Sequence, residues 1–328
     1  MITNIRPFYK VHSAPTDANS AAQVEVSSVP PNLRPVAVDL CGARPGVQVP
    51  VYAYENTTSG VAADQEYLNE RTRLGYFKDL HLSKTIDFLE REGLAKATKF
   101  ADVGCGIAFL DFALARKYPQ LEVYALDKEA KHINFNSAEK NSEGNLDNLN
   151  FAIYDLMKPH PDLEGQFDMV SSSLVMAHMA DPVSALKNMT KLLKPGGKLL
   201  AEEIDISSVK ANNEFPALEK FQKLWGEVIS SINCDAFRGP KLIELFREAG
   251  LKEIKSNHYL VTEPQETIKL AILGVIEKPK VQELLLKFSL VESQQEIDDL
   301  IIALKQGFAD SEMKIDFYNL HQVAGVKP

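Results

Sequence analysis

Three acidic residues each follow a predicted strand, and their spacing lets them bind one ligand together. Asp102 stands two residues before Gly104, in the stretch Asp-Val-Gly-Cys-Gly, and Asp127 and Asp155 follow the next two apolar runs. Glycines between a strand and a helix let the backbone approach a ligand, and the helix start adds free amides. An acid after the second strand can hold both hydroxyls of a ribose. The third can accept a hydrogen bond from an exocyclic amine, so the set predicts a site for an adenine nucleoside.

The glycine run does not fit a dinucleotide site. Such a site needs a third glycine in the pattern GxGxxG, and this sequence has Phe109 there. The carboxylate of Asp102 would also repel a pyrophosphate, whereas it would attract a cationic or zwitterionic ligand. A nicotinamide-dependent oxidoreductase is therefore disfavoured.

Alternating strands and helices must position these residues. The apolar patterns predict strands over 99–103, 121–126, 149–154, 167–172 and 198–204, with helices over 110–117 and 129–141 and from Asp181-Pro182 onward. Such alternation is typical of a parallel sheet with right-handed crossovers. The carboxyl ends of the strands, where the acids lie, would then meet at one edge.

The rest of the chain predicts additions to this sheet. We expect helices over 62–93, 213–231, 240–249 and 265–310, a sixth strand over 251–262 and a seventh over 313–326. Ser293 to Glu296 forms a capping box inside the segment 265–310. Residues 1–60 hold 7 of the 17 prolines, and we expect an irregular arm there.

Composition narrows the function classes. The 328 residues carry a net charge of −9, which weakens a nucleic-acid role. The three cysteines form no CxxC pair, so we expect neither a disulfide framework nor a metal site. No signal peptide and no apolar run of spanning length is visible, and we expect a cytoplasmic protein without membrane insertion.

The motifs together resemble the class I S-adenosylmethionine-dependent methyltransferases, in the small-molecule branch with domains similar to types 11 and 25. Besides Asp102–Gly106, the stretch 167–182 is similar to the family's FDxVxSxxVxxHxxDP, and 192–197 is similar to the turn before its fifth strand. The resemblance spans about residues 62–328. It implies an α/β fold with a Rossmann-like, seven-stranded, mostly parallel sheet flanked by helices, N-terminal helices and a helical insertion before the last strand.

The resemblance also implies domain limits and a cofactor site. The methyltransferase domain would cover 61–328, with N-terminal helices at 62–93, a cofactor-binding core at 99–205 and a helical cover at 265–310. S-adenosylmethionine would be bound by ten residues: Asp102, Gly104, Cys105, Gly106, Asp127, Lys128, Asp155, Leu156, Ser172 and Ser173. Ala108 replaces the family's third glycine. We expect it to face the cofactor, where its methyl group is tolerable if the backbone there is helical.

The expected reaction is methyl transfer to a small-molecule acceptor. A sulfonium methyl is already activated, so alignment and the exclusion of water do most of the work. A base helps when the acceptor is a hydroxyl, and we expect O-methylation before C- or N-methylation. His178, just beyond the fourth strand, is the first candidate base, and Glu203 is the second. The alternative for His178 is a structural role in the turn before Asp181.

Two other functions stay open at this point. One is a catalytically inactive S-adenosylmethionine-binding protein that regulates or partners another, because binding does not prove turnover. The other is a nucleic-acid methyltransferase, against which the charge and the lack of an Asn-Pro-Pro-aromatic motif argue. A homodimer remains open as well.

Overall fold

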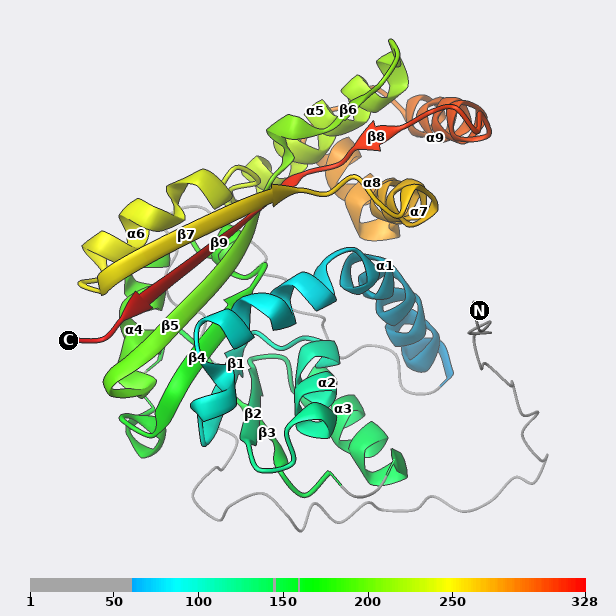
Figure 1. Ribbon diagram of the computed structural model, residues 1–328. Coiled ribbons are helices and arrows are strands. Elements are labelled where there is room, and N and C mark those ends of the chain that lie inside the picture. The colour runs from blue at the N-terminus through cyan, green and yellow to red at the C-terminus, as the bar shows by residue number, and fades with distance from the viewer. Residues whose placement is uncertain (1–60, 144–145, 159) are drawn as a thin grey trace, which may run out of the picture. The chain divides into compact units, whose positions relative to one another are not determined.

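A computed structural model describes residues 61–143, 146–158 and 160–328 of the chain (Figure 1). The irregular arm expected over residues 1–60 lies outside the described residues. Among the described residues, no helix combines the length and the apolar character needed to cross a membrane. The same residues include no group of three or more His, Cys, Asp or Glu side chains suited to a metal ion.

Seven strands form one sheet in the order β3-β2-β1-β4-β5-β9-β7. The strands are β1 (Lys99–Val103), β2 (Glu122–Asp127), β3 (Leu149–Ile153), β4 (Phe167–Ser173), β5 (Leu193–Asp205), β7 (Lys252–Leu260) and β9 (Asn319–Val326). Strands β1 to β5 pair in parallel, whereas β9 runs antiparallel to both β5 and β7. The expected seven-stranded, mostly parallel sheet is therefore confirmed.

Helices cover both faces of this sheet (Figure 1). On one face, α1 (Val61–Arg91) and α2 (Phe109–Lys117) pack Phe88, Leu89 and Leu114 against the apolar side chains of β1 and β2. On the other face, α4 (Pro182–Leu192) and α6 (Leu242–Glu248) bury Leu186 and Phe246. The remaining large helix of this core, α3 (Ala130–Glu143), links β2 to β3. The described part of 62–93 is one continuous helix, α1, rather than several.

A third layer lies beyond the carboxyl ends of β5 and β7 (Figure 1). It contains α5 (Pro216–Ser231), α7 (Gln265–Ile276), α8 (Pro279–Lys287) and α9 (Gln294–Phe308), which share one apolar core. Helix α7 also packs against α1. Glu70 of α1 forms ion pairs with Arg73 at 2.8 Å and with Lys278, between α7 and α8, at 3.0 Å.

Two strand boundaries differ from the sequence prediction. Strand β5 already begins at Leu193, because Phe167 of β4 pairs with it before the glycine turn. The expected strand 313–326 is divided into β8 (Ile315–Asp316), paired with β6 (Lys210–Ala211), and β9. The division falls at Phe317 and Tyr318, both fully buried, whose backbones bond to Val261. Burial of these two rings requires the chain to leave one sheet and enter the other.

Candidate functional site

The glycine loop between β1 and α2 requires glycine at position 104 for a steric reason. Gly104 has φ +82°, and a Cβ there would lie 2.4 Å from Cγ2 of Val175. The N–H groups of Gly104 and Cys105 both donate to the carbonyl of Leu126, at 2.7 and 3.1 Å. The loop is therefore fixed against the ends of β2 and β4, as the motif predicts.

Gly106 leaves space beside the loop. Its φ is +52°, and no atom lies within 4 Å of the position that a Cβ would occupy. Its N–H donates to Oδ2 of Asp127 at 2.8 Å, and its carbonyl accepts from Nδ2 of Asn136 at 2.8 Å. A ligand can approach the backbone here, and the buried Asn136 of α3 is a supporting residue that the sequence analysis missed.

Asp127 ties the loop to the end of β2. Its Oδ1 accepts from the N–H of Glu129 at 2.8 Å and lies 3.7 Å from Nδ1 of His132. Burial alone would raise the pKa of Asp127, but His132 and the backbone N–H groups of Glu129 and Gly106 outweigh it and lower the pKa. A carboxylate offers about four acceptor positions. The ionised group can thus still accept bonds from two hydroxyls.

Asp102 lies deeper, at the end of β1. It is 5% exposed and accepts a bond from the hydroxyl of Ser171 at 2.8 Å. Burial, with repulsion from Glu202 and Asp127, raises the pKa of Asp102 to about 7. The group is therefore poised between its two charge states near neutral pH.

Asp111, which the sequence analysis missed, is a third acid close to this loop. It sits in the first turn of α2, is fully buried, and neither of its oxygens has a hydrogen-bond partner among the described residues. Burial and repulsion from Asp102 and Asp127 hold its pKa well above the usual value. Its signal in the sequence is a lone acid within the apolar run Phe-Leu-Asp-Phe-Ala. The carboxylates that favour a cationic ligand and oppose a pyrophosphate are therefore those of Asp102 and Asp127.

Ala108 does not lie as expected. Its backbone is left-handed, with φ 53° and ψ 28°, so the condition that it be helical is not met. The residue is also fully buried and packs into the apolar core beside α1 and α2, so its methyl group does not face an open ligand site. The replacement of glycine therefore strains the backbone locally, by about 1–2 kcal/mol, and does not obstruct the loop.

Asp155, the acid after β3, already has partners at the protein surface. Asp155 accepts from the N–H of Met157 at 3.0 Å and pairs with Lys158 at 3.2 Å. Leu156 beside it is buried, and Lys128, after β2, is exposed. These residues stand at the same edge as the glycine loop, because Asp127 is aligned with Ile153 in the register of β2 and β3.

The two serines at the end of β4 face opposite sides of the sheet. Ser173 donates to Oε2 of Glu202 at 3.2 Å, on the side that α1 covers. Ser172 is 2% exposed, and its hydroxyl has no partner among the described residues. The structure thus places Ser172 and Ser173 at the end of β4 on different faces of the sheet.

The two candidate bases meet at the short helix η3 (Met176–His178) but differ in exposure. The imidazole of His178 is exposed to solvent on one side. On another side, Sγ of Cys234 lies 3.7 Å from its Nδ1. Partial burial and the charges of Lys128, Arg73 and Lys278 hold the pKa of His178 below its usual value. A neutral imidazole at the surface can accept a proton from an acceptor.

Glu203, by contrast, has no exposed surface and cannot touch an acceptor. Neither carboxylate oxygen makes a hydrogen bond of good geometry within the described residues. Burial raises the pKa of Glu203 to about 8, although the nearby amides of residues 175–177 and Arg238 oppose the rise. Glu203 lies beneath η3, and this position argues against its expected role as the second candidate base.

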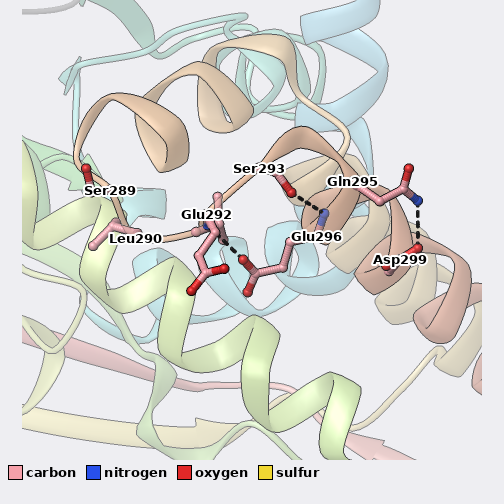
Figure 2. A pocket seen from close by; sticks show the side chains of 8 residues that line it. Ser289, Leu290, Glu292, Ser293, Gln295, Glu296 and Asp299 are labelled. Atoms are coloured by element: carbon pink, nitrogen blue, oxygen red, sulfur yellow. Dashed lines mark hydrogen bonds between the residues drawn. The ribbon is translucent and has the colours of Figure 1, made fainter.

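Two surface hollows of about 620 Å³ each lie elsewhere on the described chain. One follows α5 past Gln222 and Phe237. The other, shown in Figure 2, surrounds the start of α9, where the Glu296 N–H bonds to the Ser293 hydroxyl at 3.4 Å and Glu296 Oε2 accepts from the Glu292 N–H at 2.8 Å. This confirms the predicted cap. Neither hollow is lined by the glycine loop or by a strand end.

The part of the chain that holds the glycine loop and the acids matches a known family. Residues 94–250 match the model of a family described as a methyltransferase domain. The match supports the expected class I S-adenosylmethionine-dependent methyltransferase domain over this part of the chain. The matched part of the methyltransferase domain contains all ten residues expected to bind the cofactor, as well as His178 and Glu203.

Similar proteins include methyltransferases of two kinds. Phosphoethanolamine N-methyltransferase 1 of Zea mays is 34% identical over 142 residues, which are 43% of this chain and 27% of that protein. A ubiquinone biosynthesis O-methyltransferase of Coxiella burnetii is 29% identical over 133 residues, 40% of this chain and 55% of that protein. The chain thus spans about a quarter to a half of the length of these relatives.

The similarity to solved structures is weaker. Phosphoethanolamine N-methyltransferase 2 of Haemonchus contortus, in complex with phosphomonomethylethanolamine and S-adenosylhomocysteine, aligns with a TM-score of 0.49 and 19% identity. The alignment covers 80% of this chain and 60% of that chain.

Proposed function

We propose that this protein transfers a methyl group from S-adenosylmethionine to a small-molecule acceptor. The observation that carries the proposal is the set formed by Asp102, Gly104, Gly106 and Asp127 at one edge of the sheet. Gly106 leaves open space beside a loop that Asp127 holds. The surrounding acids suit a ligand that carries positive charge.

The described residues fit this cofactor. Asp127 would hold the ribose hydroxyls, Asp155 the adenine amine, and Asp102 would face the cationic end. The cofactor supplies an electrophilic methyl group on a sulfonium. The chain holds the ligand in line and excludes water, and these two effects account for most of the rate.

The acceptor side rests on His178. Its exposed, neutral imidazole can remove the proton of a hydroxyl as the new bond to oxygen forms, which supports O-methylation over the other two types. The relatives include both an N- and an O-methyltransferase. We propose that α7, α8 and α9, in the segment 265–310, form the cover that selects the acceptor. The cytoplasmic location expected from the sequence belongs to the same proposal.

Two measurements test the function. Calorimetry with S-adenosylmethionine tests binding, and a turnover assay with phenols, hydroxy acids and phosphoethanolamine as acceptors tests transfer. Binding with turnover of at least one acceptor supports the proposal. Binding without turnover across a broad panel would favour the alternative, a non-catalytic cofactor-binding partner. Absence of binding would contradict both.

A further inference from the structure

The loop after α5 holds η3 at three successive residues. The N–H of Asp235 donates to the carbonyl of Ala177 at 2.8 Å, and Nη2 of Arg238 donates to the carbonyl of Met179 at 3.3 Å. Between them, Sγ of Cys234 lies 3.7 Å from Nδ1 of His178. The imidazole is therefore held from the loop side, with its Nδ1 edge toward the thiol.

The position of the thiol is itself fixed. The Cys234 N–H donates to the carbonyl of Ile229 at 3.0 Å, after Asn233 turns the chain with φ 60°. Asp235 accepts from the N–H of Phe237 at 2.9 Å and from Lys241 at 2.6 Å. The sulfur thus has little freedom to move away from the ring.

The hydrogens can be assigned by counting donors and acceptors. Sγ lies 3.7 Å from the carbonyl of Ile232 as well as from Nδ1 of His178. The carbonyl can only accept, so a thiol hydrogen directed at it leaves a sulfur lone pair for an N–H of the ring. That arrangement makes two bonds. The opposite one, with the thiol donating to Nδ1, makes only one.

The charge states agree with this assignment. Burial raises the pKa of Cys234 to about 11, despite the opposing charges of Arg238 and Lys128, so the thiol keeps its hydrogen. Burial, with the charges of Lys128, Arg73 and Lys278, lowers the pKa of His178 and favours the neutral ring. A neutral ring carries one N–H, and the bond made by one nitrogen decides which nitrogen carries it.

We propose that Cys234 is a positioning residue that holds His178 with its proton on Nδ1 and leaves Nε2 unprotonated on the side away from the loop. Within the described part of the chain, Nε2 has no hydrogen-bond partner, so it is free to take the proton of an acceptor. The functional half of this inference rests on the proposed role of His178 as a base. The tautomer itself does not.

Nitrogen NMR of protein labelled in its histidines tests the tautomer directly. His178→Gln identifies the signals of His178, and Ser231→Ala, at the end of α5, serves as the matched control. We expect wild type and Ser231→Ala to show a protonated Nδ1 and a bare Nε2. Cys234→Ala, once shown to fold by circular dichroism, should shift the signals toward a protonated Nε2.

A turnover assay provides a second, independent test of Cys234. Cys234→Ala should lower kcat by about 3- to 30-fold and leave KM for S-adenosylmethionine within twofold of wild type. This loss is far smaller than the roughly 10⁴-fold loss seen when a buried carboxylate that orients a histidine is replaced. A wild-type spectrum with Nε2 protonated would overturn the inference, and so would a Cys234→Ala spectrum equal to wild type. The wild-type spectrum needs no variant of Cys234 to fold. If His178→Gln keeps full turnover, the proposed base fails while the tautomer result stands.

Discussion

Glu202 and Glu203 are neighbours on β5 whose carboxylates face opposite sides of the sheet. Glu202 accepts bonds from Thr85 at 2.7 Å, Gln322 at 2.6 Å and Ser173 at 3.2 Å. Glu203 is as deeply buried and makes no such bonds. A buried acid without partners destabilises the fold when it ionises, whereas a bonded one helps to hold the elements around it together.

Replacement of Glu203 by Gln should therefore stabilise the free protein at alkaline pH. In the folded state the pKa of Glu203 is about 8, above its usual 4.5, so folding takes up a proton between these values. Stability is then lost as pH rises through this window, at up to about 1.4 kcal/mol per pH unit. Chemical unfolding at pH 5 and pH 8 should show the gain of Glu203→Gln growing with pH.

The matched control is Glu202→Gln. Its new amide group would face three donors, and we expect a loss of about 1–3 kcal/mol. Equal effects of the two substitutions, or a gain from Glu203→Gln that does not vary with pH, would contradict this account of β5.

Asp127 should matter more for cofactor affinity than Asp155. Asp127 is 8% exposed and ionised, whereas Asp155 already pairs with Lys158 at the surface. Loss of a buried, charged hydrogen-bond partner costs about 2–3 kcal/mol, or roughly a 30- to 150-fold weaker dissociation constant. Calorimetry on Asp127→Ala, Asp155→Ala and the exposed control Asp298→Ala checks this order. An unchanged constant for Asp127→Ala would refute the ribose assignment.

Ala108→Gly tests whether the missing third glycine affects the site. Glycine relieves about 1–2 kcal/mol of left-handed strain, but it frees the unfolded chain by about 0.4–1 kcal/mol and removes a buried methyl group. These effects nearly cancel, so we expect stability within about 1 kcal/mol of wild type. Because the methyl group is covered by protein, affinity for S-adenosylmethionine should change by less than twofold. A large gain in affinity would show that Ala108 does crowd the ligand.

At the scale of elements, Glu70 joins α1 to the segment between α7 and α8. Burial would raise the pKa of Glu70, but bonds to Arg73 and the charges of Arg73 and Lys278 lower it to about 2. A lowered acid pKa contributes stability that is present above about 4.5 and is lost as pH falls toward 2.

Glu70→Gln should therefore destabilise the protein at pH 7 by about 1–3 kcal/mol, because Arg73 and Lys278, both partly buried, lose the negative charge of Glu70. Hydrogen exchange should rise most in α7 and α8. The stabilities of variant and wild type should converge as pH falls from about 4.5 toward 2. Equal exchange in both proteins at pH 7 would mean that apolar packing alone holds α1 to α7.

The elements also show what the sequence could predict. The core from β1 to β5 has local signals, namely apolar runs, glycine turns and the Asp181 cap, whose carboxylate accepts from the Ser184 N–H at 2.9 Å as expected. The break between β8 and β9 has no local signal, since burial of Phe317 and Tyr318 depends on helices far away in the chain. Asp111, Asn136 and Cys234 were missed for the same reason, because each acquires its role through contacts across the fold.

At the scale of the whole molecule, cofactor binding at the sheet edge that holds Asp102 should be coupled to the protonation of that residue. Asp102, with a pKa of about 7, lies close to Glu202 and Asp127, and their charges repel its own. A cationic ligand favours the ionised form, so binding below pH 7 should release a proton.

We therefore expect affinity for S-adenosylmethionine to rise between pH 6 and pH 8, by at most about tenfold per pH unit. Asp102→Asn keeps an oxygen for the Ser171 hydroxyl and should remove most of this dependence. Calorimetry in two buffers of different ionisation enthalpy measures the released proton. A flat pH profile for wild type would show that Asp102 does not sense the ligand.

The interior position of β9 has a consequence for how the protein is made. A ribosome delivers β9 after every other strand of the sheet, yet β9 lies between β5 and β7. Until it arrives, β5 presents an open edge over residues 198–205, and β7 lacks the strand with which it pairs in the described part of the chain. Such edges pair readily with other chains. The stretch of synthesis between residues 205 and 319 is therefore the period in which the nascent chain most needs a chaperone.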